Sequence, residues 1–261
     1  MNFLVEAIAA IGSAVLKAVA LIGELTLFAL SGLSHMVRPP YYPRLVLRSL
    51  MEIGFFSLPV VALTALFTGM VLALQSYTGF SRFDAESAIA SVVVLSITRE
   101  LGPVLAGLMV SGRAGAAMAA ELGTMRVTDQ IDALSTLSTD PMKYLVAPRL
   151  LASIIALPIL VAIADILGVM GGFLVATEKL GFSADTYLIN TFSNLRVEDV
   201  VSGLIKAAVF GFIIGLMGCF NGYRSKGGAQ GVGAATTSAV VASSILILAM
   251  DYALTQVLFF K

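Results

Sequence analysis

Five long apolar runs constrain the fold of this chain more than any other feature of its sequence. A helix needs about 20 apolar residues in a row to cross the hydrocarbon core of a bilayer. Only helices and closed barrels satisfy their backbone hydrogen bonds there. The chain is 58% hydrophobic and 12% charged, which leaves too little polar surface to cover a core in water. The sequence therefore predicts an all-α integral membrane protein with a single membrane domain over residues 1–261.

The predicted spans are transmembrane helices of unequal length. They cover residues 51–77, 88–119, 146–177, 200–222 and 233–260. Residues 1–36 precede them and are also apolar, but five polar residues fall on one helical stripe: Glu6, Ser13, Lys17, Glu24 and Ser31. This pattern is typical of an amphipathic helix that lies in the membrane interface. A signal peptide is the alternative, and the acidic start disfavours it.

The distribution of Lys and Arg near the span ends predicts the orientation of the chain. With the N-terminus in the cytoplasm, that side receives Arg38, Arg44, Arg48, Arg126, Lys143, Arg149, Arg224 and Lys226. The far side then receives Arg82, Lys179, Arg196 and Lys261. Because basic residues collect on the cytoplasmic side, the sequence predicts a cytoplasmic N-terminus and a C-terminus on the far side.

A charged pair interrupts the apolar run "ASVVVLSITRELGPVLAGLMV", which places Arg99 and Glu100 in the middle of a span. Charges at this depth are unfavourable. Neighbouring residues on a helix point about 100° apart, so the two do not form an ideal ion pair with each other. Candidate partners on other spans are Lys206, Asp165 and Asp251. Two interpretations stay open: polar contacts that fix helix packing, or the lining of a wet or amphipathic cavity that handles a substrate.

The loop between the second and third predicted spans contains a further helical pattern at residues 121–134. Its apolar positions share one face, and they are Leu122, Met125, Ile131 and Leu134. Its polar positions are Arg126, Asp129, Gln130 and Asp132. Such a helix either connects two spans in water or docks its apolar side chains into a groove of a cytoplasmic partner. The spacing alone does not choose between these.

Catalytic motifs are missing from the sequence. The only histidine, His35, stands at the end of the segment predicted to be interfacial and belongs to no catalytic motif, and the only cysteine, Cys219, excludes an internal disulfide. "KGGAQGVGAATTSA" is rich in glycine but lacks the G-K-[ST] ending of a phosphate-binding loop. We therefore expect a non-catalytic chain without a metal or cofactor, and any ATP must be bound by another chain. The balance of 16 basic and 16 acidic residues indicates no nucleic-acid partner.

Four segments resemble the MlaE/YrbE family of ABC-transporter permeases: "TRELGPVLAGLMVSGRAGAAMAAELGTMRVTDQIDAL", "DPMKYLVAPR", "FNGY" and "GAATTSAVVASSILILAMDY". The likeness covers nearly the whole chain, with the motifs in the family's order. It implies a homodimeric permease in the inner membrane of a Gram-negative bacterium, with its C-terminus in the periplasm. It also implies a cytoplasmic ABC ATPase that binds ATP, a STAS-domain protein and a periplasmic ring of mammalian cell entry (MCE) domains. Together such systems move phospholipids between the two membranes.

The same resemblance implies site residues. Residues 121–134 correspond to the coupling helix of the family, with contacts to the ATPase from Glu121, Leu122, Met125, Arg126, Asp129 and Gln130. The charged pair corresponds to one beside a lipid pocket, which we expect to include Leu72, Gln75, Tyr77, Phe80, Phe83, Arg99, Glu100, Lys206 and Asp251. Arg99 would meet the lipid phosphate through a charge-assisted hydrogen bond. Ser238 stands where the family more often has Arg, which leaves the headgroup preference open.

Two other functions compete with lipid transport at this point. One is an ion-coupled carrier in which Glu100, Asp165 and Asp251 bind protons. The other is a membrane scaffold for cytoplasmic and periplasmic partners. Co-purification of a nucleotide-binding protein would separate the transporter subunit from the carrier.

Overall fold

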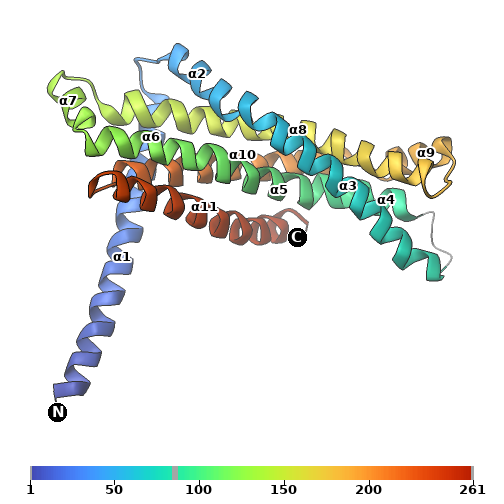
Figure 1. The fold of residues 1–261 in the computed structure, drawn as a ribbon, viewed down its shortest axis with the longest axis horizontal. Coiled ribbons are helices and arrows are strands. Elements are labelled where there is room, and N and C mark those ends of the chain that lie inside the picture. Colours follow the sequence, from blue (N-terminus) through green and yellow to red (C-terminus); the bar gives the residue numbers. More distant parts are fainter. Residues whose placement is uncertain (1, 84–87, 260–261) are drawn as a thin grey trace.

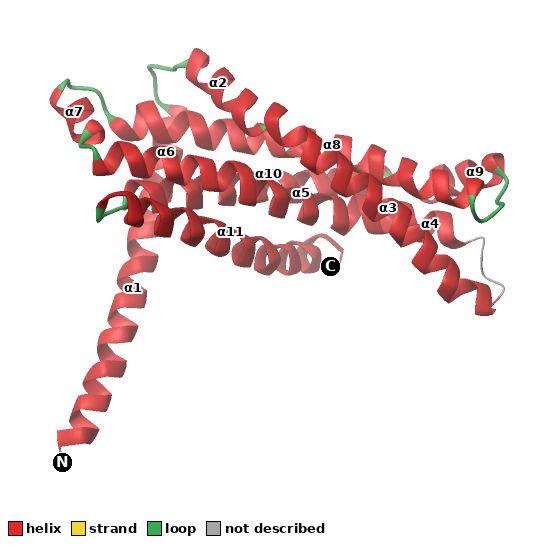
Figure 2. Ribbon diagram, viewed as in Figure 1, coloured by secondary structure: helices red, strands yellow, loops and turns green. Residues whose placement is uncertain are grey.

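The computed structural model describes the backbone of residues 2–83 and 88–259, and the side chains of residues 12–82 and 88–259. Within these ranges the secondary structure is helical throughout, without a strand (Figure 2). The α-helices are α1 (Asn2–Val37), α2 (Pro43–Ile53), α3 (Leu58–Phe80), α4 (Ile89–Ser96), α5 (Gly102–Val110), α6 (Ala116–Val127), α7 (Gln130–Thr136), α8 (Ala147–Glu178), α9 (Ala184–Asn194), α10 (Val197–Tyr223) and α11 (Gly228–Phe259) (Figure 1).

Short irregular helical turns join several of these helices. Two are 3₁₀ turns, η1 (Phe55–Ser57) and η2 (Ser81–Phe83). Three are π-helical turns: η4 (Ile97–Leu101), η5 (Ser111–Gly115) and η6 (Met142–Val146). Since η4 and η5 interrupt one long helix from Ile89 to Val127, the predicted second span is continuous but locally widened. Single-turn π-helices occur frequently at functional sites.

Six helical segments of the described chain are long and apolar enough to cross a membrane. They are Gly12–Val37, Pro43–Phe80, Ile89–Val127, Met142–Glu178, Val197–Tyr223 and Gly228–Phe259. Except for residues 88 and 260 at their ends, the last five contain the five predicted spans, so the all-α class of a multi-pass membrane protein is confirmed. The first falls on the segment predicted to lie in the membrane interface. Its length and composition suit both a helix that spans the membrane and one that lies in the interface, so the interfacial placement stays a prediction.

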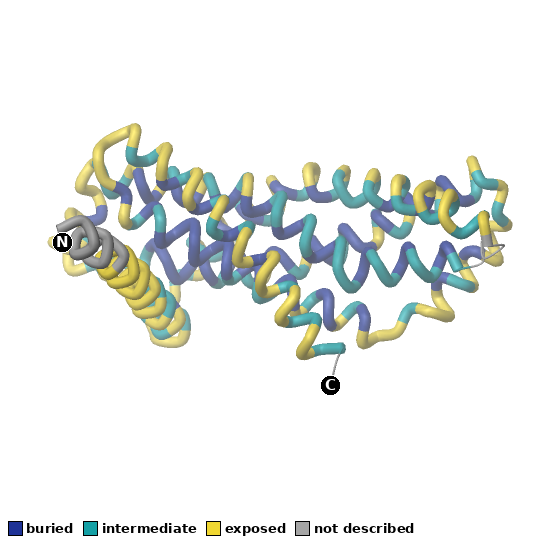
Figure 3. Tube along the Cα trace, turned by 90° about the horizontal axis from the view of Figure 1, so that it is seen from below, coloured by how far each residue is buried: buried dark blue, intermediate teal, exposed yellow. Residues whose placement is uncertain are grey.

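The helices pack around α8 and α10, which run side by side. On its other side α8 packs along α3, and α10 packs along α6 and α11. Close approach depends on glycine: a Cβ at Gly69 of α3 would stand 1.8 Å from the carbonyl oxygen of Gly168 on α8. Membrane helices pack in this way because small residues let backbones meet. The buried residues form a continuous band through the centre of the bundle (Figure 3).

Helix α1 leaves the bundle at one end and projects away from it (Figure 1). Most of its described side chains are exposed, including Leu16 and Ile22. It is attached near its C-terminal half, where the ring of Phe28 lies 5.5 Å from that of Phe220 and Glu24 pairs with Arg224 at 3.0 Å. The exposed apolar side chains of α1 are therefore free to contact lipid or another chain.

The prediction of one continuous helix over residues 121–134 is wrong, because this segment belongs to two helices. Helix α6 continues the long span to Val127, and α7 begins at Gln130. Between them Asp129 adopts a left-handed backbone conformation with φ 57°. One residue in this conformation ends the α-helical hydrogen-bond ladder, and Asp tolerates it better than most residues do. Helical spacing alone does not reveal such a break.

Candidate functional site: a charged cluster inside the helix bundle

The backbone around the charged pair is shaped by a proline. Pro103 has no N–H group and cannot close a helical hydrogen bond to a preceding carbonyl. The carbonyl oxygen of Arg99, four residues earlier, instead accepts a hydrogen bond from Lys206 Nζ at 3.1 Å. Helix α10 reaches this turn because of Gly203, where a Cβ would stand 2.3 Å from the carbonyl oxygen of Thr98. The π-turn η4 thus exposes a backbone acceptor to a lysine of a neighbouring span.

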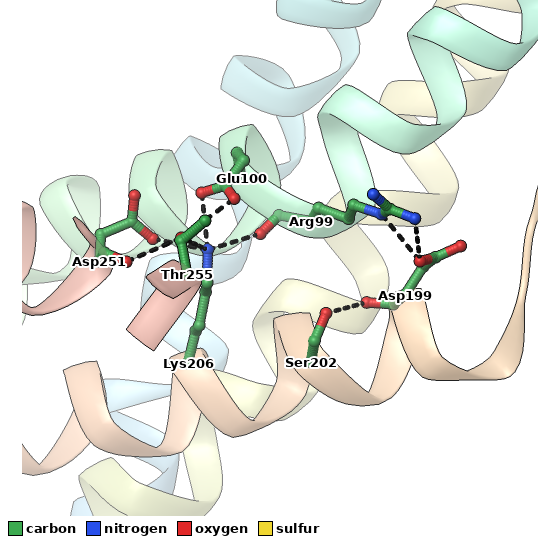
Figure 4. Close-up of polar contacts among 7 residues, drawn as sticks. All are labelled: Arg99, Glu100, Asp199, Ser202, Lys206, Asp251 and Thr255. Atoms are coloured by element: carbon green, nitrogen blue, oxygen red, sulfur yellow. Dashed lines mark hydrogen bonds and ion pairs between the residues drawn. The ribbon is translucent and has the colours of Figure 1, made fainter. Parts of the chain in front are cut away.

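Lys206 is the centre of the cluster and is completely buried. Its ammonium group donates to Glu100 Oε2 at 2.6 Å and to Thr255 Oγ1 at 2.7 Å, besides the Arg99 carbonyl. Asp251 Oδ1 lies 3.0 Å from the same nitrogen but in no hydrogen-bond geometry. The cluster therefore joins three spans, with residues from η4, α10 and α11 (Figure 4). The predicted pairing of Glu100 with Lys206 is confirmed, whereas Asp251 pairs with Lys206 and not with Arg99 or Glu100 among the described ion pairs.

Arg99 turns away from Glu100 and pairs with a residue that sequence reasoning missed. Its Nε and Nη2 atoms lie 2.8 and 2.6 Å from Asp199 Oδ1, and its guanidinium lies 4.7 Å above the ring of Phe259. Asp199 is held in place because its Oδ2 accepts the backbone N–H of Arg196 at 3.0 Å. Asp199 stands in the first turn of α10, one residue before the predicted start of the span. In the sequence, the only indication of a role for Asp199 was the presence of acidic residues in the first turn of the helix.

Asp165 lies outside the cluster, so its proposed partnership with Arg99 or Glu100 is wrong. It is buried on α8, and neither carboxyl oxygen has a hydrogen-bond partner. Its Oδ1 points at Gly102, where a Cβ would stand only 2.0 Å away. Asp165 also borders an apolar cavity of about 430 Å³ whose other walls include α9, and none of the cluster residues lines it.

The apolar residues predicted to line a lipid pocket lie elsewhere in this chain. Leu72, Tyr77 and Phe80 pack at the end of α3 against a separate hydrophobic cluster, and Gln75 is exposed. The side chain of Phe83 lies outside the described residues. None of the interactions described above joins these residues to the charged cluster. Their lipid-binding role stays a prediction. Within one chain these apolar residues and the charged cluster do not form a single site.

The residues predicted to contact an ATPase divide into two groups. Leu122 is completely buried in its own bundle, so its predicted contact with a partner is wrong. Met125 is partly buried against the same core. The others stand on the surface or at its edge: Glu121 pairs with Arg149 at 2.8 Å, Arg126 pairs with Asp132 at 2.6 Å, and Asp129 and Gln130 are exposed.

A second arginine of the same span is also held inside the bundle. Arg113 of η5 donates to Ser57 Oγ at 2.8 Å and to the carbonyl oxygen of Glu52. These partners lie on η1 and α2, so Arg113 joins the second span to the first. Tertiary packing brings the acceptors to it, and no spacing in the sequence indicates them.

The fold and the cluster define a multi-pass helical membrane protein with a partly exposed charged site inside its bundle. The model of the family "Permease MlaE" matches residues 46–257. The chain is 61% identical over 251 residues to a "Probable ABC transporter permease protein" of Rickettsia bellii, which covers 96% of both chains. It is 36% identical over 220 residues, 84% of both chains, to the "Intermembrane phospholipid transport system permease protein MlaE" of Haemophilus influenzae.

A plant relative is similar over a comparable length. The chain is 39% identical over 237 residues to the chloroplastic protein TRIGALACTOSYLDIACYLGLYCEROL 1 of Arabidopsis thaliana, which covers 91% of this chain and 66% of that one. The family match spans most of the described bundle. The chain belongs to the MlaE permease family.

Proposed function

We propose that this chain is the permease subunit of an ATP-driven transporter that moves phospholipids between the inner and outer membranes. Membership of the MlaE permease family supports this function, as does the relative from Haemophilus influenzae that is named for intermembrane phospholipid transport. The chain itself binds no ATP in this proposal, and a separate ABC ATPase binds and hydrolyses it.

One structural observation carries the proposal. Arg99 and Glu100 stand at mid-span in a largely apolar helix bundle, and both side chains remain partly exposed. Intramembrane charges that face a cavity mark substrate pathways. A phospholipid combines a charged headgroup with apolar chains, so a site for it needs both characters at the same depth.

The proposed assembly is a homodimer in the inner membrane with its N-terminus in the cytoplasm. The ATPase would dock around α7, where Asp129 and Gln130 are exposed at the start of the helix and Leu137 directly after its end. A STAS-domain protein and a periplasmic ring of MCE domains would complete it. A reporter that is active only in the cytoplasm should work when inserted after Lys226 and fail when fused after Lys261. The opposite result would reverse the proposed orientation.

The test of the function is reconstitution. The complex purified through a tag on this chain should contain a nucleotide-binding protein and phospholipid, measured as phosphorus per complex. It should transfer labelled phospholipid from proteoliposomes to acceptor MCE protein with ATP, but not with a non-hydrolysable analogue. Transfer that is driven by a proton gradient without a nucleotide-binding subunit would contradict the proposal and favour an ion-coupled carrier.

A further inference from the structure

A second cavity lies at the end of the bundle where α6 and α10 end and α11 begins (Figure 1). Its volume is about 620 Å³, which is within the range of ligand pockets. Of the described residues that line it, none belongs to the charged cluster, and the polar ones include Glu24, Arg126, Tyr223, Arg224, Lys226 and Ser238. Because the ends of membrane-spanning helices lie near the membrane surface, this cavity stands at the depth of lipid headgroups.

Three basic side chains converge on this cavity from two separate parts of the sequence. Arg126 stands in the last turn of α6, and Arg224 and Lys226 follow the end of α10. All three are accessible, since Arg126 is 34% exposed, Arg224 is 45% exposed and Lys226 is exposed as well. A ligand at the membrane surface can therefore reach each of them.

Aromatic rings hold the two guanidinium groups in place. The guanidinium of Arg126 lies 5.9 Å from the ring centre of Tyr223, and that of Arg224 lies 5.0 Å from the ring centre of Phe220. Both rings pack against Phe28 of α1, with ring centres 5.8 and 5.5 Å apart. Cations are attracted to the faces of aromatic rings. The packing of α1 against α10 therefore sets the positions of both arginines.

The carboxylates near the cavity leave part of its donor capacity unused. Glu24 lies 3.0 Å from Arg224 Nη2, and Asp132 lies 2.6 Å from Arg126 Nη1. A guanidinium has five N–H donors, so each arginine keeps donors for a ligand. The ammonium of Lys226 has no hydrogen bond or ion pair in the part of the chain that the structure describes. These donors suit an anion with several acceptor oxygens, such as a phosphate group.

The surface beside the cavity indicates that the phosphate belongs to a lipid. Ser238 lines the cavity, and Val241 and Ile245 follow it on the same face of α11, with 52% and 62% of their surface exposed. Apolar side chains thus continue from the polar cavity along the span. A phospholipid presents the same order, with its phosphate at the membrane surface and its acyl chains in the hydrocarbon core. A soluble phosphate would not contact this apolar surface.

We propose that this cavity binds the phosphate of an anionic phospholipid whose acyl chains lie along α11. Arg126, Arg224 and Lys226 contact the phosphate. A headgroup with a net negative charge binds better than a zwitterionic one, because a choline ammonium would stand beside three cations. The site is separate from the charged cluster and does not depend on the proposed transport function, since it requires only a span that ends at a lipid surface.

The experiment compares headgroups on identical acyl chains. The purified protein, with any subunits that accompany it, is exchanged into nanodiscs that contain equal amounts of phosphatidylglycerol and phosphatidylcholine. Retained lipids are counted by native mass spectrometry, and the wild type should retain more phosphatidylglycerol. Lys226→Gln should lower the ratio of the two lipids roughly fivefold, which corresponds to ~1 kcal/mol for one basic residue at a membrane surface. Ser238→Asp, which places an acid in the cavity, should lower it at least as far.

Arg44→Gln is the matched control, because Arg44 is an exposed basic residue that is predicted on the same side of the membrane and does not line the cavity. Its lipid ratio should equal that of the wild type. Inorganic phosphate in large molar excess should displace no more phosphatidylglycerol than sodium chloride of equal ionic strength does, since both screen charge equally.

Four results would overturn the inference and leave the proposed function in place. They are equal retention of both lipids by the wild type, an unchanged ratio in either Lys226→Gln or Ser238→Asp, an equal fall of the ratio in Arg44→Gln, and displacement of the lipid by inorganic phosphate beyond the effect of sodium chloride. The third result would assign the preference to basic residues at the membrane surface in general. The fourth would make the ligand a soluble phosphate.

Discussion

Lys206 Nζ lies 2.6 Å from Glu100 Oε2, and this contact joins α10 to η4 inside the membrane. Both partners depend on local backbone features: Gly203 lets α10 approach η4, and Pro103 leaves a carbonyl free for the same ammonium. The contact therefore links helix packing to the charge of the site. It also explains how a lysine without any exposed surface is tolerated at this depth.

Replacing Lys206 with Met should destabilise the protein by ~3–5 kcal/mol, because removal of one partner leaves buried charges uncompensated. The measurement is the unfolding temperature of the purified protein in detergent. Adding Glu100→Gln and Asp251→Asn to Lys206→Met removes both carboxylates and should recover most of the loss. If Lys206→Met alone unfolds like the wild type, the cluster contributes nothing to stability.

Asp199 should matter for stability through Arg99 and through the start of α10. Asp199→Ala removes the ion pair and the acceptor for the Arg196 N–H group, and we expect a loss of ~2 kcal/mol. Ser202→Ala is the matched control in the same turn, since it removes one hydrogen bond to a backbone carbonyl. It should have the smaller effect in thermal unfolding. Equal effects would mean that the Arg99 pair adds no stability.

The contact between Gly102 and Asp165 predicts an unusual response to a small substitution. In Gly102→Ala the new methyl group would meet Asp165 Oδ1 at 2.0 Å, and such overpacking costs about 1–3 kcal/mol. Gly107→Ala on the same helix is the control, because its nearest neighbours stand at 3.5 Å. Asp165→Ala should rescue Gly102→Ala in the unfolding temperature. Failure of that rescue would show that the strain lies elsewhere.

Docking of the ATPase should depend on the exposed surface around α7 and not on the buried residues of this region. Leu137 is 74% exposed beside α7, and Leu137→Asp should reduce recovery of the ATPase in co-purification at least about tenfold. Thr136→Asp adds the same charge one residue earlier and controls for charge alone. Leu122→Asp should instead lower the yield of the permease, because Leu122 is buried in its bundle. Full recovery of the ATPase with Leu137→Asp would remove this surface from the interface.

Hydrophobicity and motif order alone established the class of the protein. The five apolar runs predicted the five spans of the bundle, because the bilayer demands length and low polarity from each helix independently of its neighbours. The charged pair in mid-span marked the candidate site for a similarly local reason, since charge at that depth is rare without a function. Residues whose polarity differs from that of their sequence neighbours, such as charges within an apolar run, can be recognised without a structure.

The pairing of charges was decided by tertiary structure. The sequence offered three candidate partners for Arg99 and Glu100. Packing paired Glu100 with Lys206, placed Asp251 against Lys206, left Asp165 against Gly102 and added Asp199 as the partner of Arg99. The break at Asp129 and the burial of Leu122 were equally hidden. The ion pairs form because α10 approaches η4 and α11 closely enough to bring their charged atoms within 3 Å. The spacing of residues along the sequence does not give the distances between helices. Which charges meet at the site follows from those distances, and therefore only the folded bundle determines it.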